Sequence, residues 1–569
     1  MSNAYADRIA LQHRLFAELS AMFGAEVPLY DKSLAVNLAC NRAVCDLLAK
    51  KFPGLALSDA DIEATSGERH GAIRIGRPDE YRWIGRFFAC FAMEPHGFYD
   101  MTALGGKSQP VIATAFRSVI NPEHRVFTSL LVSDYFDEAT KDRIEAALAG
   151  RDVFGETARA LIEKCESQGG LDEADAAALI EQATTRVFKW QGKARDHALY
   201  TDLCEGGFKI AADIACFDSH HLNHLTPNTF CMDVYTSAMK FLMGELDAEA
   251  FRGRTKAALS RLAERAGQDY LILHFKHMDR DSLAALESVS LDESAVAGGL
   301  DALVSRLGDT EFELSGYPHN GFKDFTEGPD VATPVLLRQD AYKALTEDVV
   351  FTNNDGGATD TVHTARFGEI EQRFYATTPE GRARYDACLQ QFEAKRAEDP
   401  GLAKRDQPAY LAMQAGAFAE FPKEIEALLD AGLIYGRYRA TPEGAAGKAA
   451  SGETTDLREL RQAGFVAVDG LRYEDFLPFS AAGIFASNLN QYGTASTAKE
   501  RRTYAQPDLE RVLDKPIVDV NVAYRGIEAR SILETFEQLG VLGKLDAQRR
   551  EQLERDAEGC PVPLASVVA

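Results

Sequence analysis

Apolar residues recur along much of the chain at the spacing of an amphipathic helix. Over residues 6–24 and 33–50 this pattern predicts two helices, joined by a turn at the proline of EVPLYD. Over residues 136–190 it predicts three packed helices. We expect further helices within the ranges 236–310, 379–397, 408–434 and 529–556.

Short runs of β-branched and aromatic residues, separated by Gly, Pro and Asn, predict strands instead. Between residues 71 and 131 these runs are GAIRIG, YRWIGRFFACFAM, PVIATAF and HRVFTSLLV. Later candidate strands are LILHFKHMD, PVLLRQDAY and ARFGEIEQRFYAT. The two patterns together predict an α+β protein, in which many helices surround a curved mixed sheet built from strands far apart in the sequence.

We expect one catalytic unit over residues 1–569, because no repeat or low-complexity tract divides the chain. Its sheet core would come from about 60–235 and 315–500. Residues 236–310 would form a helical insertion and residues 500–569 a C-terminal helical region.

The charge balance excludes some classes of partner. Lys and Arg number 62 against 87 Asp and Glu, for a net charge of −25. Such a surface repels phosphate backbones and anionic lipid, so we expect neither a nucleic acid nor a membrane as partner. An anionic substrate would need a buried cation in its pocket.

The chain has features of a cytoplasmic protein. The first 24 residues lack a basic segment followed by an apolar run, so we expect no signal peptide. The apolar runs are far shorter than the roughly 20 residues that span a bilayer. Nine scattered cysteines without a CxxC pair are typical of reduced thiols. We therefore expect a cytoplasmic protein.

The first stretch with candidate chemistry is GERHGAIRIG at 67–76. Strand alternation places His70, Ala72 and Arg74 on one face, with His70 and Arg74 roughly 13 Å apart. This arrangement suits a ligand with a metal-binding group at one end and a carboxylate at the other, since Arg offers a two-pronged donor. The alternative is a surface histidine and a surface salt bridge.

The second stretch, HHLNHLTP, holds three of the 12 histidines within five residues. Such clustering favours metal binding, although only one of the three need be a ligand. The others could hydrogen-bond or orient that ligand, and the whole group could be structural.

The third stretch is RFGEIEQRF at 366–374. As a strand it puts Glu369, Glu371 and Arg373 on one face, which is costly if the carboxylates are buried without partners. A bound cation would remove that cost, and so would a solvated edge strand. Two histidines and a carboxylate from these three stretches form the ligand set of a non-haem iron(II) site, which leaves positions open for substrate and dioxygen.

Other motifs carry less weight. His274 and His277 have ligand-like spacing in HFKHMD, but we interpret them as structural. LGGKS at 104–108 has Met101 where a phosphate-binding loop needs its first glycine. The sequence has no HExxH, no GxGxxG after a strand and no GxSxG, so the common zinc-protease, dinucleotide-binding and serine-hydrolase signatures are missing.

The three stretches, together with PVLLRQ at 334–339 and FLPFSAAGIFASNL at 476–489, closely resemble the 2-oxoadipate dioxygenase/decarboxylase family. The likeness runs from EVPLYD past the SAAGIF stretch. It implies a partly barrel-like sheet of vicinal-oxygen-chelate type and an iron(II) (Fe2+) cofactor. It also implies that 2-oxoadipate and dioxygen are converted to 2-hydroxyglutarate and carbon dioxide, a late step of bacterial lysine breakdown.

The resemblance also implies roles for individual residues. His70 and His224 would be metal ligands, with a glutamate of GEIEQR as the third. We take Glu371 for this role, and strand alternation leaves Glu369 open. Arg74 would hold the distal carboxylate of the substrate. Phe479 and Ser480 would line the pocket beside His70. The chain departs from the family pattern at Asn228, Phe374 and Phe479.

Two other classes of function remain to be distinguished. The same scaffold could hold another metal for isomerase or lyase chemistry on a small oxo acid, with Glu369 or Glu371 as the base. The chain could also be a large acidic binding protein whose His and Glu stretches are structural. Oxygen uptake and metal content would separate these classes. The sequence leaves the oligomeric state open.

Overall fold

The computed structural model describes residues 5–102, 108–118, 124–308, 314–317, 321–322, 326–341, 345–353, 355–366, 368–448, 454–477 and 503–560. The chain forms two compact units. The first contains residues 1–323, 340–371 and 475–517, and the second contains 324–339, 372–474 and 518–569.

The first unit is built on a five-stranded mixed sheet with the order β2-β3-β4-β1-β6. Strand β1 pairs with β4 in parallel, and the other neighbours are antiparallel. The strands are β1 (Glu68–Ile75), β2 (Met93–Asp100), β3 (Val111–Ser118), β4 (Arg125–Leu131) and β6 (His224–Pro227).

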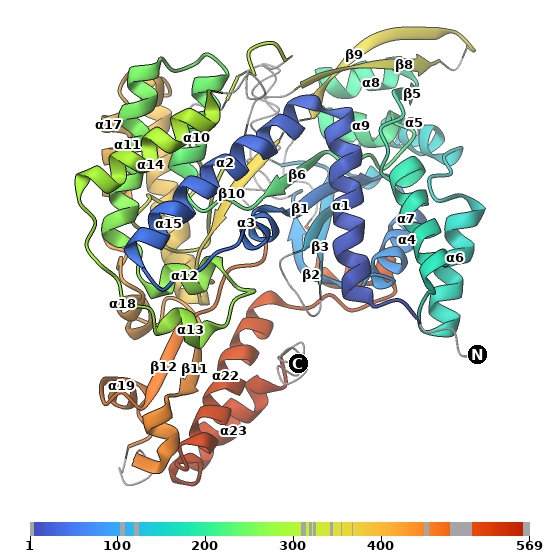
Figure 1. Ribbon diagram of the computed structural model, residues 1–569. Coiled ribbons are helices and arrows are strands. Elements are labelled where there is room, and N and C mark those ends of the chain that lie inside the picture. The colour runs from blue at the N-terminus through green and yellow to red at the C-terminus, as the bar shows by residue number, and fades with distance from the viewer. Residues whose placement is uncertain are drawn as a thin grey trace. The chain divides into compact units, whose positions relative to one another are not determined.

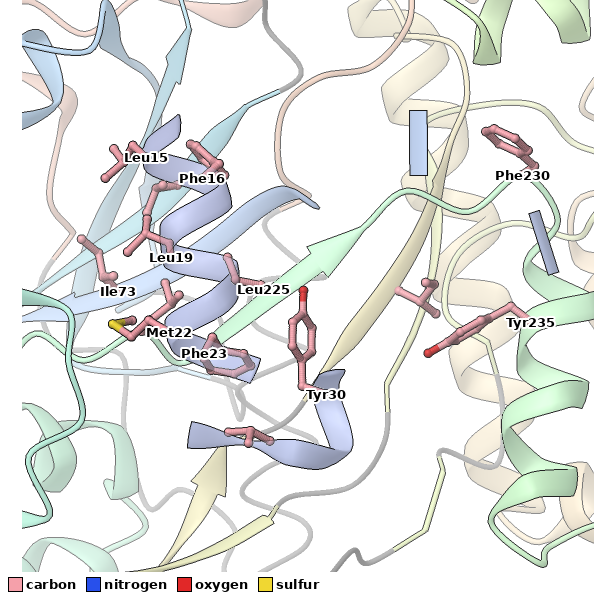
Figure 2. Packing of buried hydrophobic residues seen from close by; sticks show 14 of the residues in the cluster. Leu15, Phe16, Leu19, Met22, Phe23, Tyr30, Ile73, Leu225, Phe230 and Tyr235 are labelled. Carbon is pink, nitrogen blue, oxygen red and sulfur yellow. The ribbon is translucent and has the colours of Figure 1, made fainter. Parts of the chain in front are cut away.

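Of the two long N-terminal helices, the first lies over one face of this sheet and the second runs away from it to pack on the helices of residues 232–307 (Figure 1). The two N-terminal helices are α1 (Arg8–Glu26) and α2 (Pro28–Lys51). Figure 2 shows Leu15 and Leu19 of α1 beside Ile73 of β1. Phe23 packs edge-on against Tyr30, with 4.8 Å between ring centroids. Because alternate residues of β1 point to opposite faces, this packing leaves His70, Ala72 and Arg74 on the other face.

That other face belongs to a second buried cluster of the first unit. Ala72 lies there with Phe127 of β4 and with Ala211 and Ile214 of α9.

The connecting helices and the 3-10 turn are α3 (Asp59–Ser66), α4 (Pro78–Ala89), η2 (Ser133–Tyr135), α5 (Glu138–Ala149), α6 (Gly155–Gln168), α7 (Glu173–Gln182), α8 (His197–Glu205), α9 (Lys209–Cys216) and α21 (Gln506–Leu513).

The expected helical insertion is helical in the structure. It contains α10 (Met232–Leu242), α11 (Ala248–Arg265), α12 (Gln268–His274), α13 (Arg280–Ala284) and α14 (Glu293–Leu307). The prediction of a strand for LILHFKHMD is wrong, because the first part of this segment belongs to α12 and the rest is irregular.

Two smaller sheets follow. Strands β5 (Lys193–Arg195), β8 (Leu345–Thr352) and β9 (Ala358–Arg366) form one of them. Strands β7 (Leu337–Ala341) and β10 (Glu369–Arg373) form the other. The expected strands of PVLLRQDAY and ARFGEIEQRF are therefore present.

The second unit has its own core of helices on a hairpin. Strands β11 (Gly436–Ala440) and β12 (Val466–Gly470) are antiparallel. Ile532 and Phe536 of α22 pack there with Leu460 of α19. The helices are α15 (Pro379–Glu398), α16 (Leu402–Arg405), α17 (Gln407–Ala417), α18 (Ile425–Asp430), α19 (Leu457–Gln462), α22 (Val520–Gln538) and α23 (Ala547–Ala557).

The α+β class is confirmed, but two expectations about the sheet are wrong. No sheet among the described residues closes into a barrel. The run YRWIGRFFACFAM is mostly the helix α4, not a strand. Pro78 occupies the first turn of α4, and the Glu80 carboxylate accepts a hydrogen bond from the backbone N–H of Arg77. Both features are typical of a helix N-terminus.

The expected turn at EVPLYD is also shorter than predicted. Pro28 is the first residue of α2, and only Val27 separates α1 from α2. Within the part of the chain that the structure describes, no helix combines the length and the apolar content required to cross a bilayer.

Candidate metal centre

Strands β1 and β6 bring the first two candidate ligands together. In their antiparallel ladder Ala72 lies opposite His224, and His70 lies opposite Thr226. A bulge interrupts the ladder between Glu68 and His70, and bulges commonly re-aim side chains next to functional sites. The His70 and His224 rings are nearly perpendicular, with 5.6 Å between their centroids.

Glu369 of β10 joins these two histidines. Its Oε2 lies 3.1 Å from His224 Nε2 and 3.4 Å from His70 Nε2. One ligand atom from each of the three residues lies within 4.8 Å of the others, and all three residues are buried. The sequence left open that His70 is a surface histidine and that the Glu369 strand is a solvated edge. The burial of both residues excludes these alternatives.

The charge state of Glu369 suits a cation. Burial raises the pKa of its carboxyl, but the His224 and His70 rings outweigh that effect and bring the pKa to about 2. Glu369 is therefore ionised at neutral pH. A divalent cation bound there would compensate a buried negative charge, which is costly without a partner.

The geometry favours Glu369 over the expected Glu371 as the third ligand. Glu371 Oε1 accepts a hydrogen bond from Arg125 Nη2 at 2.8 Å, so this carboxylate already has a cationic partner. Its Oε2 lies 3.2 Å from His70 Nδ1, the ring nitrogen turned away from Glu369. A carboxylate beside the second nitrogen of a metal-binding histidine fixes the ring and its tautomer. Glu371 lies within reach of that nitrogen, without a hydrogen bond to it in this structure.

Sequence reasoning missed two neighbours of His70. Thr226 Oγ1 lies 3.0 Å from His70 Nε2 and donates to Glu369 Oε2 at 3.4 Å. The ring of Phe476 lies 4.9 Å from that of His70. The signal for Thr226 was available, because residues two apart in a strand share a face and Thr226 follows His224 by two.

Arg74 is buried on the same face of β1 as His70, as predicted. Its Nη1 donates to Asp213 Oδ2 at 3.2 Å. Asp213 lies on α9, and sequence reasoning did not single it out. Asp213 and Lys209 are the only charged residues of KIAADIAC, which is the signal that could have found them.

The remaining histidines of the sequence motifs lie elsewhere. His220 Nε2 lies 3.3 Å from Glu80, and burial lowers the pKa of His220 despite that carboxylate. His221 packs against Trp190. His277 contacts Asp61, and His274 packs on Tyr270. Phe479 and Ser480, the expected pocket residues, lie outside the described residues.

Fold and site together define a class: an α+β protein with a buried group of two histidines and one carboxylate that could hold a metal ion. A family model described as 2-oxoadipate dioxygenase/decarboxylase matches residues 15–247 and 300–488. The chain belongs to this family.

The sequences of similar proteins align with nearly the whole chain. The 2-oxoadipate dioxygenase/decarboxylase of Pseudomonas putida is 32% identical over 548 residues, which are 95% of this chain and 99% of that protein. The Escherichia coli protein of the same name is 30% identical over 90% of this chain and 95% of its own length. The crystal structure of the P. putida hydroxyglutarate synthase in complex with 2-oxoadipate aligns with a TM-score of 0.63, at 29% identity, over 95% of this chain and all of that one.

Proposed function

We propose that this protein is an iron(II)-dependent dioxygenase that converts 2-oxoadipate and dioxygen into 2-hydroxyglutarate and carbon dioxide. The buried group of His70, His224 and Glu369 carries the proposal, because it occurs in a chain of this enzyme family. We extend the proposal to a step of lysine breakdown in the cytoplasm.

The donor set fits iron(II). Two imidazoles and one carboxylate are the ligands of many non-haem iron(II) oxygenases. Bound iron would supply the activation of dioxygen and would leave positions open for the carboxylate and keto oxygens of a 2-oxo acid.

The residues around this group would orient the substrate and exclude water. Arg74 would bind the distal carboxylate of the diacid, since it is a buried cation on the face of β1 that carries His70. The rings of Phe476 and Phe127, 5.1 Å apart, shield the side of the site next to His70. Glu371 would hold the His70 ring through its Nδ1 side. Phe479 and Ser480 stay predicted pocket residues.

The reaction balances without a further reductant. One carbon–carbon bond of 2-oxoadipate breaks, and its C1 carboxylate leaves as carbon dioxide. Both atoms of dioxygen enter the products. We expect one dioxygen consumed per 2-hydroxyglutarate formed.

The test is to load the purified protein with iron(II) under anaerobic conditions and then supply 2-oxo diacids of different chain lengths with dioxygen. An oxygen electrode and product mass would show equal consumption of dioxygen and formation of 2-hydroxyglutarate, fastest for the six-carbon diacid. His70→Ala and His224→Ala should abolish oxygen uptake while circular dichroism shows a native fold. Turnover without dioxygen, or full activity in either variant, would contradict the proposal.

A further inference from the structure

Helix α9 carries an ion pair in an unusual place. All eight of its residues, Lys209–Cys216, are buried, and Lys209 and Asp213 are its only charged residues. The Asp213 side chain is 1% exposed. Taking two charges out of water carries a desolvation cost comparable to what a good ion pair returns, so such a pair is weak evidence for a purely stabilising role.

Asp213 contacts three basic groups from three different elements. Its Oδ2 accepts from Arg74 of β1. Its Oδ1 is in contact with Lys209 Nζ and lies 3.3 Å from His363 Nε2 of β9. Burial raises the pKa of Asp213, but Lys209, His363 and Arg74 outweigh this effect and hold the pKa well below its usual range. Asp213 is thus a fixed anion beside Arg74.

The outer neighbours of this cluster complete its surroundings. Glu347 Oε2 of β8 lies 3.5 Å from His363 Nδ1, on the side of the ring away from Asp213. Lys209 Nζ lies 4.9 Å from the ring centroid of Tyr200 and 5.9 Å from that of Phe217. These groups enclose Lys209 and His363 beside Asp213.

Arg74 is the member of the cluster that shares a strand with the candidate ligand His70. It follows His70 by four residues on the same strand face, and the residue between them on that face is Ala72. Opposite Arg74 in the ladder with β4 stands Ser129, another small residue. A free arginine side chain has high rotamer entropy, so its orientation must be fixed if it is to measure the length of a substrate.

We propose that Asp213, held by Lys209 and His363, is a positioning residue that fixes the Arg74 guanidinium for the distal carboxylate of a dicarboxylic 2-oxo acid. The inference rests on the proposed function, in which Arg74 binds that carboxylate. Asp213 touches no substrate; it acts through Arg74 and sets the preference for diacids over monoacids.

The test is a double-mutant cycle with Arg74→Ala, Asp213→Asn and the double variant. The two substrates are 2-oxoadipate and 2-oxohexanoate, which has the same chain without the distal carboxylate. Each single variant should lower kcat/KM for 2-oxoadipate roughly 10-fold or more, mainly through KM, and change 2-oxohexanoate less than about 2-fold. The double variant should lose no more than Arg74→Ala alone.

The inference is overturned if the fold losses of kcat/KM in the two single variants multiply in the double variant. It is also overturned if Asp213→Asn lowers kcat/KM equally for both substrates. Glu80→Gln is the matched control, because Glu80 is also a buried carboxylate paired with an arginine, Arg151, and a histidine, His220. It should lower stability and leave the preference between the two acids unchanged. The same change of preference in Glu80→Gln would also overturn the inference.

Two further measurements keep the test decisive. Lys209→Gln should reduce the preference in the same direction by a smaller factor, and it carries the test if Asp213→Asn does not fold. Calorimetry of the zinc-loaded protein measures binding of both acids without turnover. Loss of the binding preference for 2-oxoadipate in Asp213→Asn supports the inference even if the iron enzyme shows no oxygen uptake; an unchanged preference overturns it.

Discussion

Two glutamates two residues apart have different surroundings, and this difference separates their expected roles. Glu369 faces both histidines, whereas Glu371 is paired with Arg125 and lies beside the far nitrogen of His70. Strand alternation could not separate them, because residues i and i+2 share a face. The distinction depends on Arg125, which lies 246 residues away in sequence.

Substitution of each glutamate should give different results. Glu369→Gln should abolish stoichiometric iron binding, because it removes the charged ligand. Glu371→Gln should keep the iron but weaken its affinity by roughly 10- to 100-fold, as loss of a group that orients a histidine ligand does. Competition with a chelator measures both. The reverse order of affinities would make Glu371 the ligand.

Among the other predicted residues, strand alternation put His70 and Arg74 on one face of a strand. The local pattern did not choose among the three clustered histidines, and only the family resemblance pointed to His224. Asp213 was not found, since its role depends on β1 and β9 meeting α9. The sequence could show only that two charges interrupt an apolar helix.

At the level of elements, the closeness of β1 and β6 sets the position of His224. A Cβ added at Gly71 would lie 3.1 Å from both Leu222 Cδ1 and Leu225 Cδ2, and 3.3 Å from the His224 carbonyl oxygen. These contacts are tighter than ordinary van der Waals distances. The absence of a side chain at Gly71 therefore allows the approach of the two strands.

Gly71→Val should force β6 away from β1 and displace His224. We expect weaker iron binding together with a loss of roughly 1–3 kcal/mol in the free energy of unfolding, as overpacking typically causes. Chelator competition and urea unfolding measure the two effects. The control is Gly253→Val on α11, where an added Cβ meets nothing within 4 Å; it should leave the iron affinity unchanged. Native iron affinity in Gly71→Val would contradict this account.

Helices could be predicted where apolar residues recur with a clear helical period. The prediction failed where the amino-acid composition favoured the wrong element. The long helices α1 and α2 and the helices of residues 136–190 follow their apolar spacing. Helix α4 was mistaken for a strand because its aromatic residues favour strands. Yet Tyr81, Ile84 and Phe88 are buried at helical spacing. Hairpin β11–β12 and strand β2 were missed, because short strands give little signal.

At the scale of the whole molecule, the chain has two compact units. The metal centre and the Asp213 cluster lie in the first unit. The second unit carries its own titrating group, Glu528 of α22. Its carboxylate accepts a hydrogen bond from the backbone N–H of Gly436 in β11 at 2.8 Å. Burial, aided by Asp556, raises the pKa of Glu528 to about 7 despite that hydrogen bond.

This pKa predicts how stability depends on pH. The folded chain holds the Glu528 proton more tightly than the unfolded chain, whose carboxyl has its ordinary pKa of about 4.3. The free energy of unfolding should therefore fall as the pH rises from about 5 through 7. Glu528→Gln should match the wild type at pH of about 5 and be more stable at about 8. Urea unfolding followed by circular dichroism measures this difference. Glu534→Gln, an exposed change on the same helix, is the control; an identical pH dependence in Glu528→Gln and the wild type would contradict the prediction.

The spacing of the ligand residues also bears on how the protein acquires its cofactor in the cell. Positions 70, 224 and 369 lie on three separate strands, so a chain still on the ribosome has no complete site until residue 369 has emerged and β10 has docked. On the proposed function, iron(II) would bind only after these three strands have come together. Iron starvation of cells should then yield protein without its metal, which regains activity when iron is supplied.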